Sequence, residues 1–320
     1  MPDGEFLAII VTALLIDAVA GDPASLYRVV PHPVVIFGRA IGFLDRHCNR
    51  SSFGAGLKRL AGAAAIGILL ALSLWLGYWL RGVLSAFPYG GAAEALIIST
   101  LIAQNSLYRH VRRVALALEN SGLGAGRGAV AMVVGRDTGA LDEAGVSRAA
   151  IESLAENYSD GVVAPVLWAV LLGLPGIIAF KMLNTADSMI GHRTPRHTDF
   201  GMAAARLDDI ANYFPARFAA LFLWLAALGR GAGTILRDAN RHRSPNAGYP
   251  EAAMAVGLGL KLSGPRIYDG AGGDGPKQEP WIGSGREAAT PADIRAGLRL
   301  YVKACLALFA LVAIAALLAA

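Results

Sequence analysis

The sequence predicts an all-α protein that crosses a lipid bilayer several times and carries helices and loops on the cytoplasmic side. Hydrophobic residues make up 55% of the 320 residues and charged residues only 17%, and the mean hydropathy is +0.48. Soluble globular proteins carry roughly a quarter charged residues, so the charges here are too few to coat a soluble surface. This composition excludes intrinsic disorder, a coiled coil and collagen, and it argues against a purely soluble enzyme.

Apolar segments with the character of membrane helices occur along the whole chain. A spanning helix needs about 20 apolar residues, and residues 60–80 are the clearest candidate because they form a long uncharged run. The other segments are shorter, contain Asp17 or are interrupted. The full set of candidates is 6–20, 60–80, 95–108, 161–180, 213–229 and 304–320. We expect them to belong to a single domain that comprises residues 1–320.

The distribution of Lys and Arg predicts the orientation. Basic residues gather in four stretches, 28–59, 109–148, 181–217 and 230–303. The positive-inside rule puts these stretches in the cytoplasm and the link from Arg81 to Glu94 outside. Residues 161–180 lie between two basic stretches and are interrupted by Leu174-Pro175-Gly176. They therefore predict a re-entrant hairpin or a helix buried in protein, since irregular backbone at membrane depth needs protein around it.

Other features exclude several classes of site and partner. Residues 263–291 are rich in Gly and Pro and predict a flexible loop. Cys48 and Cys305 lie far apart, and the histidines show no metal-ligand spacing, so we expect neither a disulfide framework nor a structural metal. The net charge of +5 is explained by arginine-rich cytoplasmic loops or by anionic substrates, and we expect no nucleic-acid partner.

A first polar cluster begins at the end of the second basic stretch of the sequence. Arg148, Glu152, Glu156 and Asp160 recur every four positions, which on a helix gives one acidic stripe headed by an arginine. This stripe is either a solvated face or part of a site. The position of the stripe favours a site, because an apolar segment follows immediately. Placing carboxylates at a membrane boundary costs free energy unless they are paired or bind a metal.

Two further polar clusters come later in the chain. In the second cluster Lys181, Asn184 and Ser188 share a helix face, and Asp187 follows Asn184 by three positions. An ammonium group together with hard oxygen ligands suits a phosphate and Mg²⁺. The third cluster places several polar side chains close together beside an apolar helix. Its members are Arg206, Asp208, Asp209, Asn212 and Arg217.

Several strings of this sequence resemble the CobD/CbiB family of adenosylcobinamide-phosphate synthases, over residues 7–300. The strings are Asp17 with Gly21-Asp22-Pro23, His32-Pro33-Val34, Ser147 to Gly161, Asn184-Thr185 with Asp187-Ser188-Met189, Asp199-Phe200-Gly201, Ala205 to Asp209 and Pro250 to Met254. The resemblance implies a multi-pass enzyme of the cell inner membrane, with its active site facing the cytoplasm. It implies ATP and Mg²⁺ as cofactors, and a corrinoid acid and aminopropanol phosphate as substrates. The acid and the amine would be joined through an amide, after ATP has converted the acid into an acyl phosphate.

This resemblance also implies roles for the clustered side chains. Glu152, Glu156, Asp187 and Lys181 are the candidate catalytic residues. Glu156, Asp187, Asp208 and Asp209 are the candidate Mg²⁺ ligands, and one carboxylate of these sets acts as a base. The residues expected to bind ATP or the substrates are Arg148, Asn157, Asn184, Ser188, Arg206 and Arg217.

Two other functions stay open at this point. An intramembrane prenyltransferase also holds a Mg²⁺-diphosphate with Asp- and Asn-rich helices, and Asp208-Asp209 with Asn212 partly imitates its motif. A transporter or an assembly scaffold is the third interpretation, because interrupted apolar segments are common in transporters. The lipid bilayer is an expected partner in every case. Association with a second copy, or with other enzymes of the same pathway, is also left open.

Overall fold

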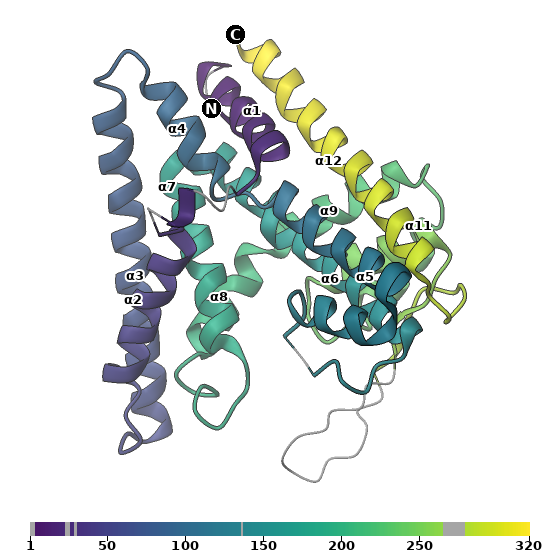
Figure 1. Cartoon of the computed structure of the whole chain (residues 1–320). Coiled ribbons are helices and arrows are strands. Elements are labelled where there is room, and N and C mark those ends of the chain that lie inside the picture. The colour runs from purple at the N-terminus through teal and green to yellow at the C-terminus, as the bar shows by residue number, and fades with distance from the viewer. Residues whose placement is uncertain (1–3, 23–25, 29–30, 136, 265–278) are drawn as a thin grey trace. The chain divides into compact units, whose positions relative to one another are not determined.

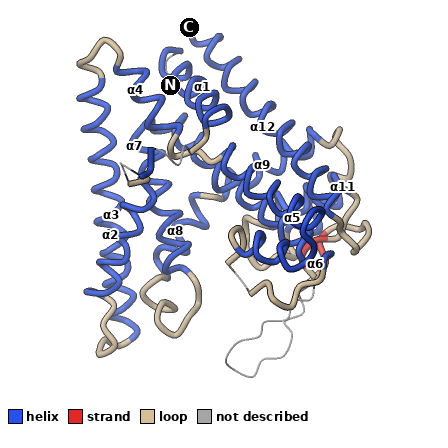
Figure 2. Tube along the Cα trace, in the orientation of Figure 1, coloured by secondary structure: helices blue, strands red, loops and turns tan. Residues whose placement is uncertain are grey.

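Helices form almost the entire protein. The computed structural model describes residues 4–22, 26–28, 31–135, 137–264 and 279–320, and 76% of the protein is helical (Figures 1 and 2). Within the described residues the strands are limited to β1, Leu262–Ser263, and β2, Trp281–Ile282, which pair antiparallel with Leu262 opposite Ile282. The predicted all-α class is confirmed.

The chain divides into two compact units. The first comprises residues 1–103, 164–212 and 311–320, and the second comprises residues 104–163 and 213–310. The first unit contains α1 (Gly4–Ala20), a 3-10 turn (Leu26–Arg28), α2 (Pro33–Cys48), α3 (Ala55–Leu84), α4 (Gly90–Ser99), α7 (Ala164–Ala186), a π-helical turn η3 (Asp187–Gly191) and α8 (Met202–Ala211). The second contains α5 (Gln104–Ala131), α6 (Glu143–Tyr158), a π-helical turn η2 (Ser159–Val163), α9 (Tyr213–Ala226), α10 (Ala232–Ala239), α11 (Gly248–Leu258) and α12 (Pro291–Ala319) up to Ala310. The single domain expected over residues 1–320 stays a prediction.

Among the described residues, three helices are long and apolar enough to cross a membrane. They are Ala55–Leu84, the helical run Glu143–Gly191, and Pro291–Ala319. Protein covers 28% and 17% of the most apolar stretch in the first and third helices but 72% in the second. The predicted segment 161–180 lies in this second helix, which breaks at Gly173, where φ is 73°. Its burial agrees with the alternative of a helix surrounded by protein.

The expected membrane segment 95–108 comprises the end of one helix and the start of the next, and it stays a prediction. Helix α4 ends at Ser99 and α5 begins at Gln104. The Ser99 hydroxyl donates to the Leu96 carbonyl at 2.8 Å, and the Thr100 hydroxyl donates to the Ile97 carbonyl at 2.8 Å. Such local bonds compete with the backbone ladder and favour a helix end. The composition of the segment shows its apolar character but not this interruption.

Two other segments also differ from expectation. Helix α9 ends at Ala226, before the end of the predicted segment 213–229, because Leu228 and Gly229 adopt left-handed backbone angles. The predicted loop 263–291 is not irregular throughout, since Ser263 pairs with Trp281 in the β1–β2 ladder. Residues 265–278 of that loop lie outside the described residues.

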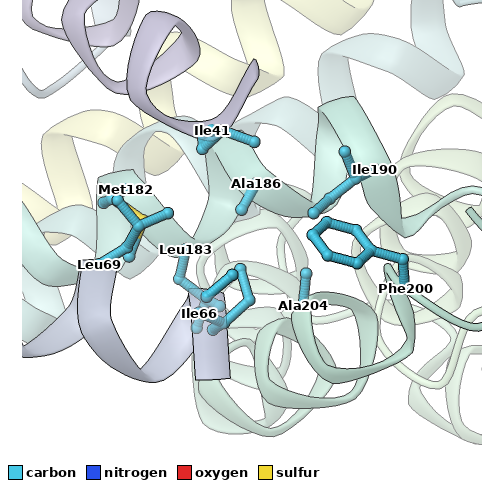
Figure 3. Close-up of a cluster of buried hydrophobic side chains, with 10 residues drawn as sticks. Ile41, Ile66, Leu69, Met182, Leu183, Ala186, Ile190, Phe200 and Ala204 are labelled. Atoms are coloured by element: carbon cyan, nitrogen blue, oxygen red, sulfur yellow. The ribbon is translucent and has the colours of Figure 1, made fainter. Parts of the chain in front are cut away.

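The core of the first unit lies where α2, α3, α7 and α8 meet. Its buried side chains are Ile41, Ala65, Ile66, Leu69, Met182, Leu183, Ala186, Ile190, Phe200 and Ala204. The Phe200 ring lies between Ile190 and Ala204 (Figure 3). Because Met182, Leu183 and Ala186 face this core, the remaining face of the same helix carries the polar residues of the second cluster.

Glycines let α3 approach its neighbours closely. A Cβ atom on Gly62 would lie 1.9 Å from the Phe200 carbonyl oxygen, and one on Gly77 would lie 2.3 Å from the Pro175 Cα atom. Both contacts are far shorter than any real Cβ contact. The packing of α3 against α7 and against the segment before α8 therefore requires glycine at both positions.

Candidate functional site

In the first unit, polar residues gather at the end of α7. The Thr185 hydroxyl donates to the Lys181 carbonyl at 2.6 Å, and the Ser188 hydroxyl donates to the Asn184 carbonyl at 3.0 Å. The helix then widens into η3 from Asp187 onward. Single π-helical turns inside α-helices occur frequently at functional sites. The second predicted cluster therefore lies at an irregular point of the helix.

Asp208 of α8 joins this cluster. Its side chain is buried, and it accepts hydrogen bonds from the Asn212 amide at 2.9 Å and from the Asn184 amide at 3.4 Å. The pKa of Asp208 is raised to about 7, mainly by burial and also by the charges of Asp187 and Asp209, while the two amides oppose the shift. Among the described residues, its hydrogen-bond partners are amides and no ion pair joins it to a cation.

The polar neighbours of Asp208 are Asn212, Asp187 and Asp209. Asn212 is only 1% exposed, and its Oδ1 atom has no hydrogen-bond partner among the described residues. The Asp187 carboxylate occupies the space above Gly191, where a Cβ atom would lie 1.9 Å from its Oδ1 and 3.5 Å from the Cβ atom of Ala205 in α8. Asp209 is exposed on α8, and partial burial of its carboxyl group raises its pKa.

In the part of the chain that the structure describes, no group of three or more His, Cys, Asp or Glu side chains that could hold a metal ion is found. The predicted Mg²⁺ ligand set of Glu156, Asp187, Asp208 and Asp209 stays a prediction. Lys181 is half-buried on α7, and Arg206 is exposed on α8. Both cations belong to the same unit as Asp208.

In the second unit, α6 carries the first predicted cluster and uses part of it to hold the β1–β2 segment. Arg148 donates through Nη1 to the Glu287 carbonyl at 2.8 Å, and its guanidinium lies 5.4 Å from the centre of the Trp281 ring. The buried Glu152 carboxylate accepts the Ser263 backbone N–H at 2.7 Å. The stripe is thus neither wholly solvated nor wholly available to a ligand, and the catalytic role of Glu152 stays a prediction.

We expect Glu152→Ala to destabilise the protein by roughly 1–3 kcal/mol, because the buried Ser263 N–H would lose its acceptor. Glu152→Gln keeps an acceptor oxygen and should recover most of this loss. Thermal unfolding of the purified protein in detergent measures both effects. Glu143→Gln, at an exposed position of the same helix, is the control and should change stability by no more than about 0.5 kcal/mol. A melting temperature of Glu152→Ala equal to that of the wild type would contradict the anchoring role.

The end of α6 presents the other members of this cluster. Glu156 and Asn157 are exposed. The Asn157 amide donates to the Ser153 carbonyl at 2.8 Å and to the Ser153 hydroxyl at 2.9 Å. This pair of bonds fixes the amide and leaves its oxygen as an acceptor toward solvent. Asp160 lies in η2, the second π-helical turn.

Arg217 of α9 is held by two aromatic rings. Its guanidinium carbon lies 3.5 Å from the centre of the Tyr213 ring and 4.1 Å from that of the Tyr249 ring. Its Nη1 atom donates to the Tyr213 carbonyl at 2.6 Å and to Asn246 Oδ1 at 3.2 Å. The sequence indicates a cation at this position but not its aromatic surroundings.

Two histidine–carboxylate pairs in the structure were not predicted from the sequence. His32 faces Asp22, with 3.5 Å between Nε2 and Oδ1, and the Tyr27 hydroxyl donates to the same Oδ1 at 3.2 Å. In the second unit, His242 Nε2 lies 3.6 Å from Glu251 Oε1. In both histidines the backbone N–H two residues later points at Nδ1, and in His242 the Ser244 carbonyl oxygen also lies 3.3 Å from Nδ1. Each histidine is separated in sequence from its carboxylate partner, so residue spacing does not predict the pair. Only the short sequence strings that contain these residues could have indicated a role.

Comparisons with known proteins confirm the family resemblance that the sequence strings indicate. The profile of the CobD/Cbib protein family matches residues 10–301. A protein named "Cobalamin biosynthesis protein CobD" from Sinorhizobium sp is 51% identical over 309 residues, which cover 93% of this chain and 94% of the relative. This chain belongs to the CobD/CbiB family. A relative of the same name from Sinorhizobium fredii is 50% identical, covering 96% of this chain and 95% of the relative. One from Rhodobacter capsulatus is 46% identical, with 94% of each chain covered. No solved structure gives a significant match.

Proposed function

We propose that this CobD/CbiB protein joins adenosylcobyric acid to (R)-1-aminopropan-2-yl phosphate through an amide bond, in an ATP-dependent step of cobalamin biosynthesis. The family match and the names of the relatives support the pathway. The observation that carries the chemistry is the environment of Asp208. A buried carboxylate with acidic neighbours and only amide partners among the described residues is suited to receive a cation.

This environment fits Mg²⁺ bound together with ATP. Mg²⁺ keeps several waters and is usually held by one or two carboxylates plus substrate phosphates. Asp187 and Asp208 would hold the ion, and the buried Oδ1 atom of Asn212 offers a further hard oxygen. Asp209 and Glu156 remain candidate ligands. When bound, the ion neutralises charge on the polyphosphate during phosphoryl transfer.

The polar groups of the first unit then have separate tasks. Lys181 and Arg206 contact phosphate oxygens of ATP or of the amino-alcohol phosphate. The Asn184 amide fixes Asp208, and the Ser188 hydroxyl closes the turn that carries Asp187. Loss of the Lys181 or Arg206 side chain would leave phosphate charge without a counter-charge. Loss of the Asn184 amide would leave Asp208 less well oriented.

The second unit supplies a proton acceptor in this proposal. A carboxylate is a poor acyl donor because its charge repels the nucleophile and oxide is a poor leaving group. Phosphorylation by ATP gives an acyl phosphate, from which the amine displaces phosphate. The amine attacks in its neutral form and therefore needs a base. Glu156 is our candidate because it is exposed at the end of α6, whereas Glu152 already accepts the Ser263 N–H. The Asn157 amide would orient the amine substrate.

We assign the protein to the cell inner membrane as a multi-pass protein with its site facing the cytoplasm. Three apolar helices of sufficient length support membrane insertion, and the basic stretches of the sequence support the orientation. ATP is available on that side, so the orientation also agrees with the proposed reaction.

Product analysis tests this function directly. Membranes that contain the protein are incubated with adenosylcobyric acid, aminopropanol phosphate and Mg-ATP, and the corrinoids are analysed by mass. We expect the coupled corrinoid together with ADP, and no coupling when ATP is omitted. Intact acid and intact ATP after incubation with folded protein would refute the proposal. Turnover of a prenyl diphosphate in a parallel reaction would instead favour the prenyltransferase.

A further inference from the structure

The guanidinium group of Arg217 is held in one orientation by its surroundings. Tyr213 covers one side at 3.5 Å and Tyr249 lies at 4.1 Å, both measured to the ring centres. One nitrogen, Nη1, is used by the Tyr213 carbonyl and by the Asn246 side chain. An arginine fixed in this way has already lost most of its side-chain freedom, so a ligand that binds it loses little further entropy.

The opposite edge of this guanidinium is available to a ligand. Among the described residues, no hydrogen bond joins Nε or Nη2 of Arg217 to an acceptor. These two nitrogens present parallel N–H groups, which match the two oxygens of a carboxylate. The edge therefore forms a preorganised fork for one oxyanion.

Two helices begin beside this fork and strengthen its attraction for anions. Tyr213 is the first residue of α9, a helix of 14 residues, and Tyr249 is the second residue of α11, a helix of 11 residues. Helix N-termini carry partial positive charge. Both helix starts therefore favour an oxyanion at the fork.

An aromatic surface adjoins the fork. The Phe214 ring packs edge-on against Tyr213 with 5.3 Å between the ring centres. Phe214 is 64% exposed and Tyr213 is 47% exposed. Exposed aromatic rings beside a fixed cation suit a large ligand that combines apolar surface with a carboxylate. A free phosphate or a small amino-alcohol phosphate offers no surface to such rings.

We propose that Arg217 binds the reacting carboxylate of the corrinoid acid, and that Tyr213 and Phe214 contact the macrocycle beside it. This inference rests on the proposed function and deepens it, since it assigns the acid substrate to the second unit. Arg217 fixes the carboxylate through Nε and Nη2 and partly neutralises its charge. Coupling converts the acid into an amide, which cannot accept the same pair of N–H bonds through two oxygens. The fork therefore favours the substrate over the product.

The role of Arg217 is tested by measuring equilibrium binding in the absence of ATP, with the absorbance of the corrinoid as the signal for binding. Purified protein in detergent is titrated with adenosylcobyric acid and with the primary amide of the same corrinoid. We expect the wild type to bind the acid roughly 10- to 100-fold more tightly than the amide, the range for hydrogen bonds to charged groups. Arg217→Gln should abolish this preference. Arg217→Lys should lose most of it, because an ammonium group is a point charge without the fork. The exposed Arg230, replaced by Gln, is the matched control and should keep the full preference.

The outcomes separate this inference from the proposed function. Binding of acid and amide with equal affinity by the wild type would overturn the role of Arg217 and leave amide ligation standing, and it requires no variant to fold. Competition of inorganic phosphate with the acid at equimolar concentration would overturn it as well, because the fork would then be a phosphate site. Full preference for the acid in a folded Arg217→Lys variant would also overturn it. Absence of any corrinoid binding to the wild type would overturn both proposals.

Discussion

Asp208→Asn is expected to reduce ATP-dependent amide formation by at least about 100-fold, because losing a metal ligand should cost no less than losing a group that orients one, which costs about 10- to 100-fold. The substitution removes the negative charge from the buried position between Asn184 and Asn212 and keeps the size of the side chain. Amide formation in membranes, measured at limiting Mg²⁺, is the readout. Asp187→Asn and Glu156→Gln should also lose turnover under these conditions, since both residues are predicted to bind Mg²⁺ or to act as a base.

The stability of Asp208→Asn distinguishes a functional role from a structural one. In the wild type a carboxylate is buried without a cation partner among the described residues, and burial of the charged form costs free energy. A neutral amide avoids this cost, so we expect the inactive variant to melt at the same temperature as the wild type or higher. The exposed Asp137, replaced by Asn, should change neither property. Near-normal turnover of Asp208→Asn at limiting Mg²⁺ would remove Asp208 from the site.

Gly62→Ala is expected to be the most destabilising methyl addition on α3. The new Cβ atom would lie 1.9 Å from the Phe200 carbonyl oxygen, a backbone atom. Either α3 or the segment that leads into α8 has to move, and overpacking of this kind costs typically 1–3 kcal/mol. Because Phe200 and Ala204 belong to the same core as Ile190, the displacement should also disturb Asp208 and reduce turnover.

Gly67→Ala on the same helix is the matched control. A Cβ atom there meets nothing within 4 Å, and alanine favours a helix over glycine by about 1 kcal/mol. Thermal unfolding in detergent should therefore show Gly67→Ala at or above the wild type and Gly62→Ala well below it. Equal melting temperatures of the two variants would show that the close approach of α3 to Phe200 is not required.

Composition was sufficient to predict the fold class, and local strings were sufficient to predict the types of residue in the site. Lys181, Asn184, Asp187 and Ser188 occupy one helix end because their spacing is helical, which is a property of adjacent positions. The break of the predicted segment 95–108 was missed because it depends on hydroxyl groups that bond to nearby carbonyls. Such bonds do not change hydropathy.

The long-range contacts could not be predicted from the sequence. Glu152 and Ser263 are 111 positions apart, and Arg148 and Glu287 are 139 positions apart. A stripe of charges on α6 gives no information about which backbone groups will reach it. The aromatic surroundings of Arg217 depend in the same way on the packing of α11 beside α9, where Tyr249 and Asn246 lie 32 and 29 positions further along the chain.

The π-helical turns η2 and η3 imply that the helix is less stable at these two points, where the first and second polar clusters lie. A π turn accommodates roughly one residue more than an α turn, so its backbone bonds skip to the fifth residue instead of the fourth. Loss of one residue from Asp187–Gly191 would restore regular winding, yet it would rotate everything that follows by about 100°, the angle per residue of an α-helix. Sequence changes that make this stretch a better helix are thus a route to losing activity. Insertions or deletions here should be selected against more strongly than substitutions on the exposed apolar side of α3.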